Sequence, residues 1–468
     1  MKELMIPIKT ESKIPLYEQI YQYIREEIKG SRLQCDTRLP STRALSSFLQ
    51  VSRSTVELAY AQLTAEGYIH SLPCKGYYVS DISLLYQLQT HTFPVEEKTV
   101  TKTEQFDINF SLKGIDMDAF PYNSWRKVTR EILSGDNKEL FIGGATKGDL
   151  DFRETVSVYL RESRGVNCSP HQIIIGAGNE YLLMLLYQIF GLIFQSQKVN
   201  IVMENPTYIQ AYKVFCGLGG NIIAVPVDGN GMSYEILELH KEAQAAYIMP
   251  SHQFPTGNVM PMKRRLELLK WANEKENRYI IEDDYDSEFR YKGKPIPALQ
   301  GMNAADKVVY IGTFSKSIAP AIRVSYLVLP PKLMEIYEKK MSYYANTVPR
   351  LHQKVLESFI RQEYYARHLN RMRSLYKNKH DMMINLLKEQ QMTYYGENVG
   401  LHLLVEVKNK KSEQQIIHEA RNAGVKIYGL SQFAIAPLNT PSTVILGFGS
   451  MKEQEIEKGM NILKSVWK

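Results

Sequence analysis

Apolar residues near the start of the chain recur at helical spacing. The first such stretch has its apolar residues at Leu16, Ile20, Ile24 and Ile28. A four-residue period places these side chains on one face of a helix, and the glycine that follows, Gly30, is a common C-terminal stop. The pattern therefore predicts one amphipathic helix before residue 30.

Two shorter helices are predicted directly after it, each preceded by a serine that can cap its first turn. Ser41 would cap a helix with Leu45, Phe48 and Leu49 turned inward, and Ser52 would cap the next. The inward positions of that third helix are Val56, Ala59, Tyr60 and Leu63. Strand-like runs at 68–70 and 76–79 flank a turn. Together they predict a helix-turn-helix followed by a two-stranded wing in residues 1–80.

The rest of the chain alternates apolar strand-like runs with helical stretches. The runs cover residues 172–175, 200–203, 221–227, 246–249, 278–281, 308–311 and 324–329. Such alternation predicts a doubly wound, mostly parallel sheet, whose ligands bind at the C-terminal ends of the strands. From about residue 349 a long helix and an α+β pattern indicate a smaller lobe, so the chain is expected to be a multidomain α/β protein.

Residues 81–108 lose the helical period, are threonine-rich and charged, and are expected to be a flexible linker. The predicted domains are therefore residues 1–80 and 109–468, with the small lobe at about 349–468. No apolar run approaches the roughly 20 residues that span a bilayer, and no signal peptide is evident, so a cytoplasmic protein without a membrane partner is expected. The four cysteines lack metal-site spacing, and no metal is expected.

A net charge of +7 would favour contact with a polyanion but does not prove it. In residues 1–80, Lys and Arg exceed Asp and Glu only slightly. DNA binding would therefore depend on where the arginines lie, and a helical module used for protein contacts remains the alternative.

Chemistry-bearing residues follow three of the predicted strands. The first strand leads into Gly176-Ala-Gly-Asn-Glu-Tyr181, which lacks the third glycine of a dinucleotide site and fits one phosphate at a helix N-terminus better. A later strand ends in the four carboxylates of 282–286. Three interpretations are open for them: a solvated acidic loop, a metal site, or a site where one carboxylate holds a protonated pyridine nitrogen. The next strand ends in Thr313-Phe-Ser-Lys316, a lysine placed to react with an aldehyde.

Residues 38–69 closely resemble the winged helix-turn-helix of the GntR family of bacterial regulators. The resemblance implies binding to double-stranded DNA. It implies DNA contacts at Arg43, Arg53, Ser54, Thr55, Lys75 and Gly76. Family members usually have Gly-x-Gly-Thr at the wing tip, whereas this chain has Pro73-Cys-Lys-Gly76 and lacks the first glycine.

The region from Asp107 to the C-terminus resembles fold-type I aminotransferases of class I/II, which use pyridoxal 5'-phosphate. By this resemblance Lys316 is the catalytic lysine that forms the Schiff base, Asp283 the partner of the pyridine nitrogen, and Tyr285 the donor to the phenolic oxygen. The other residues expected to bind the cofactor are Gly178, Asn179, Glu180, Tyr208, Thr313, Ser315 and Arg323. Tyr208 would cover the ring, while the others would hold the phosphate.

Fusion of these two domains resembles the MocR branch of GntR regulators, which includes the GABA-responsive and pyridoxine-synthesis regulators. Three departures from ordinary aminotransferases bear on activity. Phe254 replaces the asparagine of Asn-Pro-Thr-Gly, Ile445 replaces the arginine that holds a substrate carboxylate, and the run before Gly148 has no tyrosine. Weak or no physiological transaminase activity is therefore expected.

The main hypothesis is a transcriptional regulator that senses pyridoxal phosphate, or an amine or amino acid that reacts with it. Sites of this fold type normally need two chains, so a homodimer is expected. The alternatives are an active aminotransferase with a DNA-binding appendage and a scaffold without cofactor in which Lys316 is idle.

Overall fold

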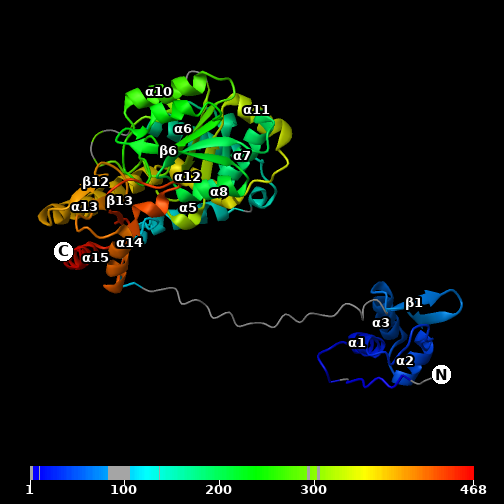
Figure 1. Ribbon diagram of the computed structural model, residues 1–468. Coiled ribbons are helices and arrows are strands. Elements are labelled where there is room, and N and C mark those ends of the chain that lie inside the picture. Colours follow the sequence, from blue (N-terminus) through cyan, green and yellow to red (C-terminus); the bar gives the residue numbers. More distant parts are fainter. Residues whose placement is uncertain are drawn as a thin grey trace. The chain divides into compact units, whose positions relative to one another are not determined.

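The structure is a computed structural model that describes residues 4–9, 11–82, 106–135, 137–291, 293, 296–302 and 306–467. The chain divides into two compact units, Met1–Thr103 and Glu104–Lys468 (Figure 1). Most of the expected linker, residues 83–105, lies outside the described residues, and Ile108 at its end already belongs to a strand. No helix among the described residues is long and apolar enough to cross a membrane.

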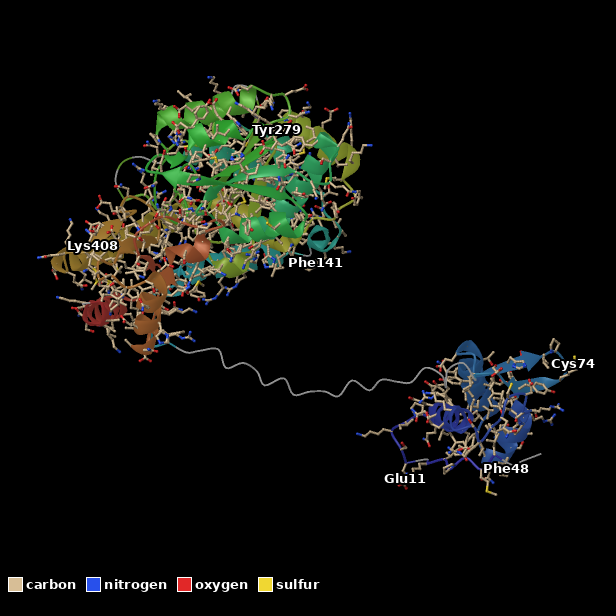
Figure 2. The ribbon with its side chains drawn as sticks, in the orientation of Figure 1. Glu11, Phe48, Cys74, Phe141, Tyr279 and Lys408 are labelled. Atoms are coloured by element: carbon tan, nitrogen blue, oxygen red, sulfur yellow. The ribbon has the colours of Figure 1, made fainter. Side chains whose placement is uncertain are left out.

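The N-terminal unit is a three-helix module with a hairpin. Its elements are α1 (Leu16–Lys29), α2 (Thr42–Leu49), α3 (Arg53–Ala65), β1 (Ile69–Leu72) and β2 (Gly76–Val79). Both predicted caps are present, because the Ser41 hydroxyl accepts from the Ala44 N–H and the Ser52 hydroxyl from the Thr55 N–H. The antiparallel hairpin β1–β2 places Cys74 at its tip (Figure 2). The predicted helix-turn-helix with a wing is confirmed.

The prediction that Phe48 faces the core was wrong. Phe48 is 47% exposed and lies at the surface of the N-terminal unit (Figure 2), whereas Leu45 is buried. Helix α2 has only eight residues and faces the core with one narrow stripe. Thr42, Leu45 and Ser46 fill that stripe, so Phe48 is turned outward.

The second unit contains an eight-stranded mixed sheet in the order β4-β11-β10-β9-β8-β5-β6-β7. The strands are β4 (Ile173–Gly176), β5 (Asn200–Asn205), β6 (Asn221–Asp228), β7 (Gly231–Met232), β8 (Ala245–Ile248), β9 (Tyr279–Asp284), β10 (Val308–Thr313) and β11 (Ser325–Val328). The five central strands β10, β9, β8, β5 and β6 pair in parallel with one another. Strand β11 is antiparallel to both its neighbours, and the short β7 is antiparallel to β6. The expected mostly parallel sheet is confirmed.

Helices pack on both faces of this sheet because alternate strand residues point to opposite sides. Ile281 packs in one apolar cluster with helix α7, and its neighbour Ile280 packs in another with α10. The helices of this region are α5 (Tyr122–Leu133), α6 (Leu150–Arg164), α7 (Asn179–Phe194), α8 (Ile209–Gly217), α9 (Tyr234–Leu239), α10 (Met262–Asn273), α11 (Pro331–Lys340) and α12 (Arg350–Arg361). Short 3-10 helices are η1 (Met117–Ala119), η2 (Lys138–Phe141), η3 (Pro170–Gln172), η4 (Gln300–Met302) and η5 (Pro320–Ile322).

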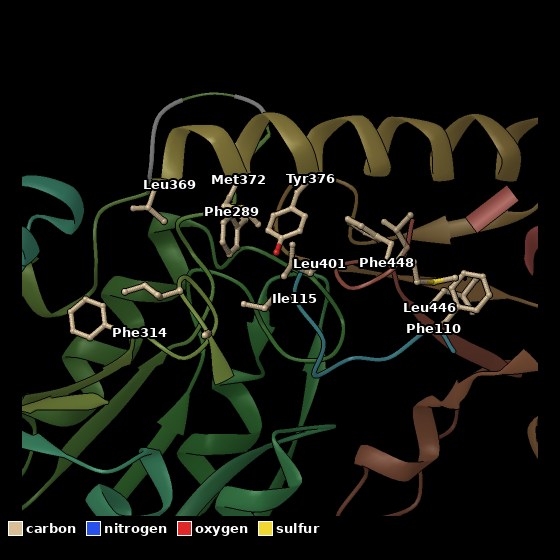
Figure 3. Packing of buried hydrophobic residues seen from close by; sticks show 14 of the residues in the cluster. Phe110, Ile115, Phe289, Phe314, Leu369, Met372, Tyr376, Leu401, Leu446 and Phe448 are labelled. Carbon is tan, nitrogen blue, oxygen red and sulfur yellow. The ribbon is translucent and has the colours of Figure 1, made fainter. Parts of the chain in front are cut away.

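A smaller α+β lobe follows, built on a four-stranded sheet in the order β12-β13-β16-β15. Its elements are α13 (Tyr364–Glu389), β12 (Thr393–Tyr395), β13 (His402–Glu406), α14 (Glu413–Asn422), β14 (Val425–Lys426), β15 (Tyr428–Gly429), η6 (Leu430–Phe433), β16 (Thr443–Gly447) and α15 (Glu453–Val466). The long helix α13 runs along this lobe and turns Leu369, Met372 and Tyr376 toward Phe289 and Leu401 (Figure 3). Strand β3 (Ile108–Asn109) pairs in parallel with β14, which attaches the start of the second unit to this lobe.

Candidate functional site

A cavity of about 580 Å³ opens at the C-terminal ends of β9 and β10, beside the first turn of α7. This is the edge at which open α/β sheets bind ligands. Nine of the ten residues expected to bind the cofactor line it, namely Asn179, Glu180, Tyr208, Asp283, Tyr285, Thr313, Ser315, Lys316 and Arg323. The tenth, Gly178, is the N-cap residue of α7, one position before the lining residue Asn179.

The four carboxylates of 282–286 are all buried, which excludes a solvated acidic loop. Alternation along β9 turns Glu282 and Asp284 away from Asp283. Glu282 accepts two backbone N–H groups, from Leu299 and Gln300, at 2.8 Å. Among the described residues no group of three or more His, Cys, Asp or Glu side chains could hold a metal ion.

Asp284 is neutralised separately, by an ion pair of 2.8 Å with the buried Arg164. The Tyr310 hydroxyl also donates to it at 2.6 Å. Arg164 holds the pKa of the Asp284 carboxyl below its usual range, against the opposing effect of burial. Asp283 is thus left to face the cavity.

Asp283 receives donors from two other elements. The Tyr247 hydroxyl of β8 donates to one carboxylate oxygen, and Nδ2 of Asn179 donates to the other at 3.4 Å. Burial raises the pKa of Asp283 to about 7, although both hydrogen bonds lower it. A positively charged group in the cavity would stabilise the ionised carboxylate, as a protonated pyridine nitrogen does.

Lys316 is partly buried, and its Nζ donates to the carbonyl oxygen of Leu112 at 2.6 Å. Burial lowers the pKa of Lys316 to about 8; the Asp286 carboxylate raises it and the Lys113 ammonium lowers it further. At pH 7 about a tenth of the Lys316 side chains are therefore neutral, nucleophilic amines, a far larger share than for a free lysine.

The part of the cavity expected to bind the phosphate combines the start of α7 with the turn after β10. Arg323 has a left-handed backbone (φ 51°), and its Nη2 forms a 2.7 Å ion pair with Glu180. A Cβ atom at Gly178 would lie 2.1 Å from that same nitrogen, so the close approach requires glycine. The Thr313 hydroxyl accepts from the Ser315 N–H at 3.1 Å, whereas the Ser315 hydroxyl is buried without a described partner.

The half-buried Tyr285 forms a polar group with the buried residues His252 and Asp286. The hydroxyl of Tyr285 lies 2.8 Å from Nδ1 of His252, which is also 2.7 Å from the Asp286 carboxylate. The imidazole stacks on the Tyr285 ring with centroids 5.4 Å apart. His252 therefore fixes the orientation of the tyrosine that faces the cavity.

The departures from ordinary aminotransferases are visible in the structure. Phe254 lines the cavity and meets Tyr208 and Tyr285 edge to face, so an apolar ring stands where an amide would stand in those enzymes. Ile445 is fully buried in an apolar cluster with Leu404 and Leu430. Position 445 therefore provides no charge for a substrate carboxylate.

The residues expected to contact DNA lie on α2, at the start of α3 and on the wing. Arg43, Arg53 and Ser54 are exposed, whereas Thr55 is half-buried, with its hydroxyl 2.7 Å from that of Ser52. Arg53 forms an exposed ion pair of 2.8 Å with Glu57, one turn along α3.

On the wing, Lys75 is exposed and Gly76 has φ 105°. The side chain of Arg38 passes within 3.7 Å of a Cβ built at Gly76. Arg38 is thus a further cation beside the wing, and the sequence analysis missed it although it begins the segment that resembles GntR regulators.

Several residues that line the cavity or lie behind its lining were also missed. Tyr247 and His252 touch residues that are distant in the sequence, and only the motif Ser251–Gly257 hinted at the latter. Lys113 and Lys426 line the cavity from segments without a recognisable motif.

Comparisons with known proteins match both units. The model of the family "Bacterial regulatory proteins, gntR family" matches residues 16–79, and that of "Aminotransferase class I and II" matches residues 109–463. The chain is 38% identical to the uncharacterized HTH-type transcriptional regulator YdeL of Bacillus subtilis over 97% of each chain. It is 29% identical to the probable rhizopine catabolism regulatory protein MocR of Rhizobium meliloti, over 99% of this chain and 96% of that one.

Among solved structures, the kynurenine aminotransferase of Pyrococcus horikoshii superposes with a TM-score of 0.69 and 26% identity. The match covers 78% of this chain and 91% of the aminotransferase. The second unit thus has the fold of class I and II aminotransferases, and the first has that of GntR regulators. The chain belongs to the MocR subfamily of GntR transcriptional regulators.

Proposed function

We propose that this regulator binds pyridoxal 5'-phosphate in the cavity at Lys316 and controls DNA binding according to what occupies that cavity. One observation carries the proposal. Asp283 from β9 and Lys316 and Arg323 from the connection between β10 and β11 line one cavity in a chain that also has a winged helix-turn-helix.

The residues of the cavity fit the parts of this cofactor. Asp283 would hold the ring nitrogen and Tyr285 the phenolic oxygen, while Tyr208 would cover the ring. The phosphate would take the N-terminus of α7 with Gly178, Asn179 and Glu180, and the side chains of Thr313, Ser315 and Arg323. When bound, the cofactor supplies an aldehyde that reacts with primary amines and a ring that accepts electrons.

Buried polar atoms without a described partner support this fit. Oδ1 of Asn179 and the hydroxyls of Ser315 and Ser325 are buried and unsatisfied, and all three residues line the cavity. Buried polar atoms normally have hydrogen-bond partners, so a polar ligand would satisfy them. The ion pair of Arg323 with Glu180 would then have to open, because a phosphate competes for the same guanidinium.

A regulator needs a ligand that binds one arrangement of the protein more tightly than another. An amine or amino acid that competes with Lys316 for the aldehyde is such a ligand. If it displaced Lys316 from the cofactor, the Lys316 Nζ would be free to donate again to the Leu112 carbonyl. We place the protein in the cytoplasm as a homodimer on DNA. Its two winged modules would contact two half-sites.

Turnover as an aminotransferase is not favoured. Ile445 is buried among aliphatic side chains, and Phe254 removes a polar contact beside Tyr285. We therefore propose that reaction at Lys316 reports the presence of a ligand and that transamination is weak.

The test is the visible absorbance of the purified chain after addition of pyridoxal 5'-phosphate. Wild type should develop a band that Lys316→Ala lacks, while Lys332→Ala, which removes an exposed lysine outside the cavity, should keep it. A colourless wild type would contradict the proposal. Rapid conversion of the band by many common amino acids would favour the aminotransferase instead.

A further inference from the structure

One wall of the cavity is built by the segment that begins the second unit. Strand β3 pairs with β14, and the Phe110 N–H donates to the Lys426 carbonyl at 3.0 Å. The Tyr428 hydroxyl donates to Oδ1 of Asn109 at 3.4 Å, which ties β15 to the same wall. Ser111, Leu112 and Lys113 continue from this strand along the cavity, facing it together with Lys426 and Tyr428.

Two ammonium groups on this wall form no ion pair with a described residue. Among the described residues no carboxylate lies within ion-pair distance of Lys113 or Lys426. Lys426 instead contacts the faces of the Phe106 and Tyr428 rings at 5.4 and 5.9 Å from their centroids. The cavity therefore carries two unpaired positive charges on one wall.

The acidic groups that line the cavity already have partners. Glu180 is paired with Arg323, and Asp286 lies 2.7 Å from the His252 imidazole. Asp283 accepts from Tyr247 and Asn179. Lys113 acts electrostatically on the Glu180 carboxylate from beyond ion-pair distance, but Glu180 is already paired with Arg323, so Lys113 and Lys426 have no ion-pair partner among the described residues.

The same wall adjoins the reactive amine. Lys316 Nζ donates to the Leu112 carbonyl at 2.6 Å, and Lys113 is the next residue. A ligand whose amine takes the place of Lys316 would thus have its remaining atoms close to Lys113. On the adjoining strand, Tyr428 is the register partner of Ile445, the position that lacks the arginine of aminotransferases.

We propose that Lys113 and Lys426 form an anion subsite that binds the carboxylate of an effector carrying a primary amine. This inference rests on the proposed function, because it assumes that the effector amine reacts in the cavity of Lys316. It assigns the effector to the amino acids, with the carboxylate held from the β3–β14 wall and not from position 445. A lysine ammonium is a point charge and lacks the planar fork of an arginine guanidinium. Two lysines therefore admit carboxylates at more than one angle.

The test compares amino acids with the amine that remains when the carboxylate is removed. Alanine and β-alanine share ethylamine as that amine and hold the carboxylate at different distances from nitrogen. Binding to the cofactor-loaded chain is measured by calorimetry and by the change in visible absorbance. Wild type should bind at least one amino acid about tenfold to a hundredfold more tightly than ethylamine, the size expected for charge-assisted contacts.

The variants Lys113→Met and Lys426→Met should each lose most of this preference and bind ethylamine as wild type does. Lys408→Met is the matched control, since Lys408 is an exposed lysine of the same unit outside the cavity (Figure 2), and it should keep the preference. Lys426→Arg should also keep it, which separates loss of charge from damage to the fold.

Equal affinity of wild type for the amino acids and ethylamine would overturn the subsite, as would a preference that survives in both methionine variants. A chain that never develops the cofactor band would overturn the proposed function, and the subsite with it. A band without carboxylate preference would overturn the subsite alone.

Discussion

Asp283 and Lys316 owe their properties to burial more than to their neighbours. For both, loss of water is the largest influence on the pKa, and it moves both groups toward their neutral forms near pH 7. Glu282 and Asp284 flank Asp283 on the same strand but point to the other face, where backbone N–H groups and Arg164 satisfy them. The face of the strand on which each carboxylate lies determines its role.

The reaction of Lys316 with the cofactor's aldehyde should depend on pH. Only the neutral amine attacks, so with a pKa of about 8 the rate should rise between about pH 7 and pH 9 and then level. The Asp286 carboxylate favours the ammonium form, so Asp286→Asn should move the midpoint to lower pH. Rapid-mixing absorbance measures both profiles. A midpoint near that of a free lysine, about 10.4, would contradict the account.

The ion pair between Arg323 and Glu180 predicts opposite effects of two substitutions. Arg323→Ala should weaken binding of pyridoxal 5'-phosphate about tenfold or more, because a charge-assisted contact to the phosphate is lost. Glu180→Gln should strengthen it, since the guanidinium no longer has to leave a carboxylate. Equilibrium dialysis measures both affinities. If Glu180→Gln weakens binding as much as Arg323→Ala does, the two residues do not compete in this way.

At the scale of elements, local signals predicted the N-terminal unit almost completely. The caps at Ser41 and Ser52 and the apolar stripes of α1 and α3 depend only on neighbouring residues, and all were confirmed. The prediction for Phe48 was wrong because a helix of eight residues has a narrow buried stripe, and the periodicity of apolar residues does not show where that stripe ends.

Long-range pairings were beyond sequence reasoning. The insertion of antiparallel β11 between β4 and β10 depends on how a 3-10 turn reverses the chain after β10. The contact of Tyr247 with Asp283 spans two strands, and that of Lys316 with Leu112 spans more than two hundred residues. Such contacts follow from the order of strands in the sheet and leave no local periodicity.

Strand β16 gives a prediction about the missing arginine. Ile445→Arg should destabilise the chain by roughly 3–5 kcal/mol, the cost of an unpaired buried charge, whereas Ile445→Val should cost about 0.5–1.5 kcal/mol. The reason is that Ile445 is fully buried in one apolar cluster with Leu404 and Leu430. Denaturant unfolding measures both. An arginine variant as stable as wild type would show that the side chain reaches the cavity.

Helix α3 gives a prediction about DNA binding. Arg53→Ala should weaken binding to a selected DNA site by about 1–3 kcal/mol and keep the cofactor band, because its exposed side chain lies at the start of the recognition helix. Arg32→Ala is the matched control, since Arg32 is as exposed as Arg53 and pairs with Glu27 at the same 2.8 Å as Arg53 with Glu57. Gel-shift titration compares them, and equal losses in both variants would contradict a specific role.

At the scale of the whole molecule, the two units must communicate if the protein regulates transcription. The segment that bears Leu112 and Lys113 begins the second unit, shortly after residues 83–105. Lys316 donates to Leu112 only while its Nζ carries a free N–H in that direction. Under the proposed function, reaction of this lysine would change a contact on the segment that follows residues 83–105 in the sequence, and we propose that occupancy of the cavity affects DNA binding through this segment.

The most direct measurement is the affinity of the chain for a DNA fragment that wild type selects from a random pool, with and without pyridoxal 5'-phosphate. Allosteric coupling of ordinary size predicts a change of about fivefold or more for wild type. Lys316→Ala should bind the same fragment with an affinity that the cofactor does not alter. An identical response of wild type and Lys316→Ala, or no response of wild type to the cofactor or to any amine added with it, would contradict the account.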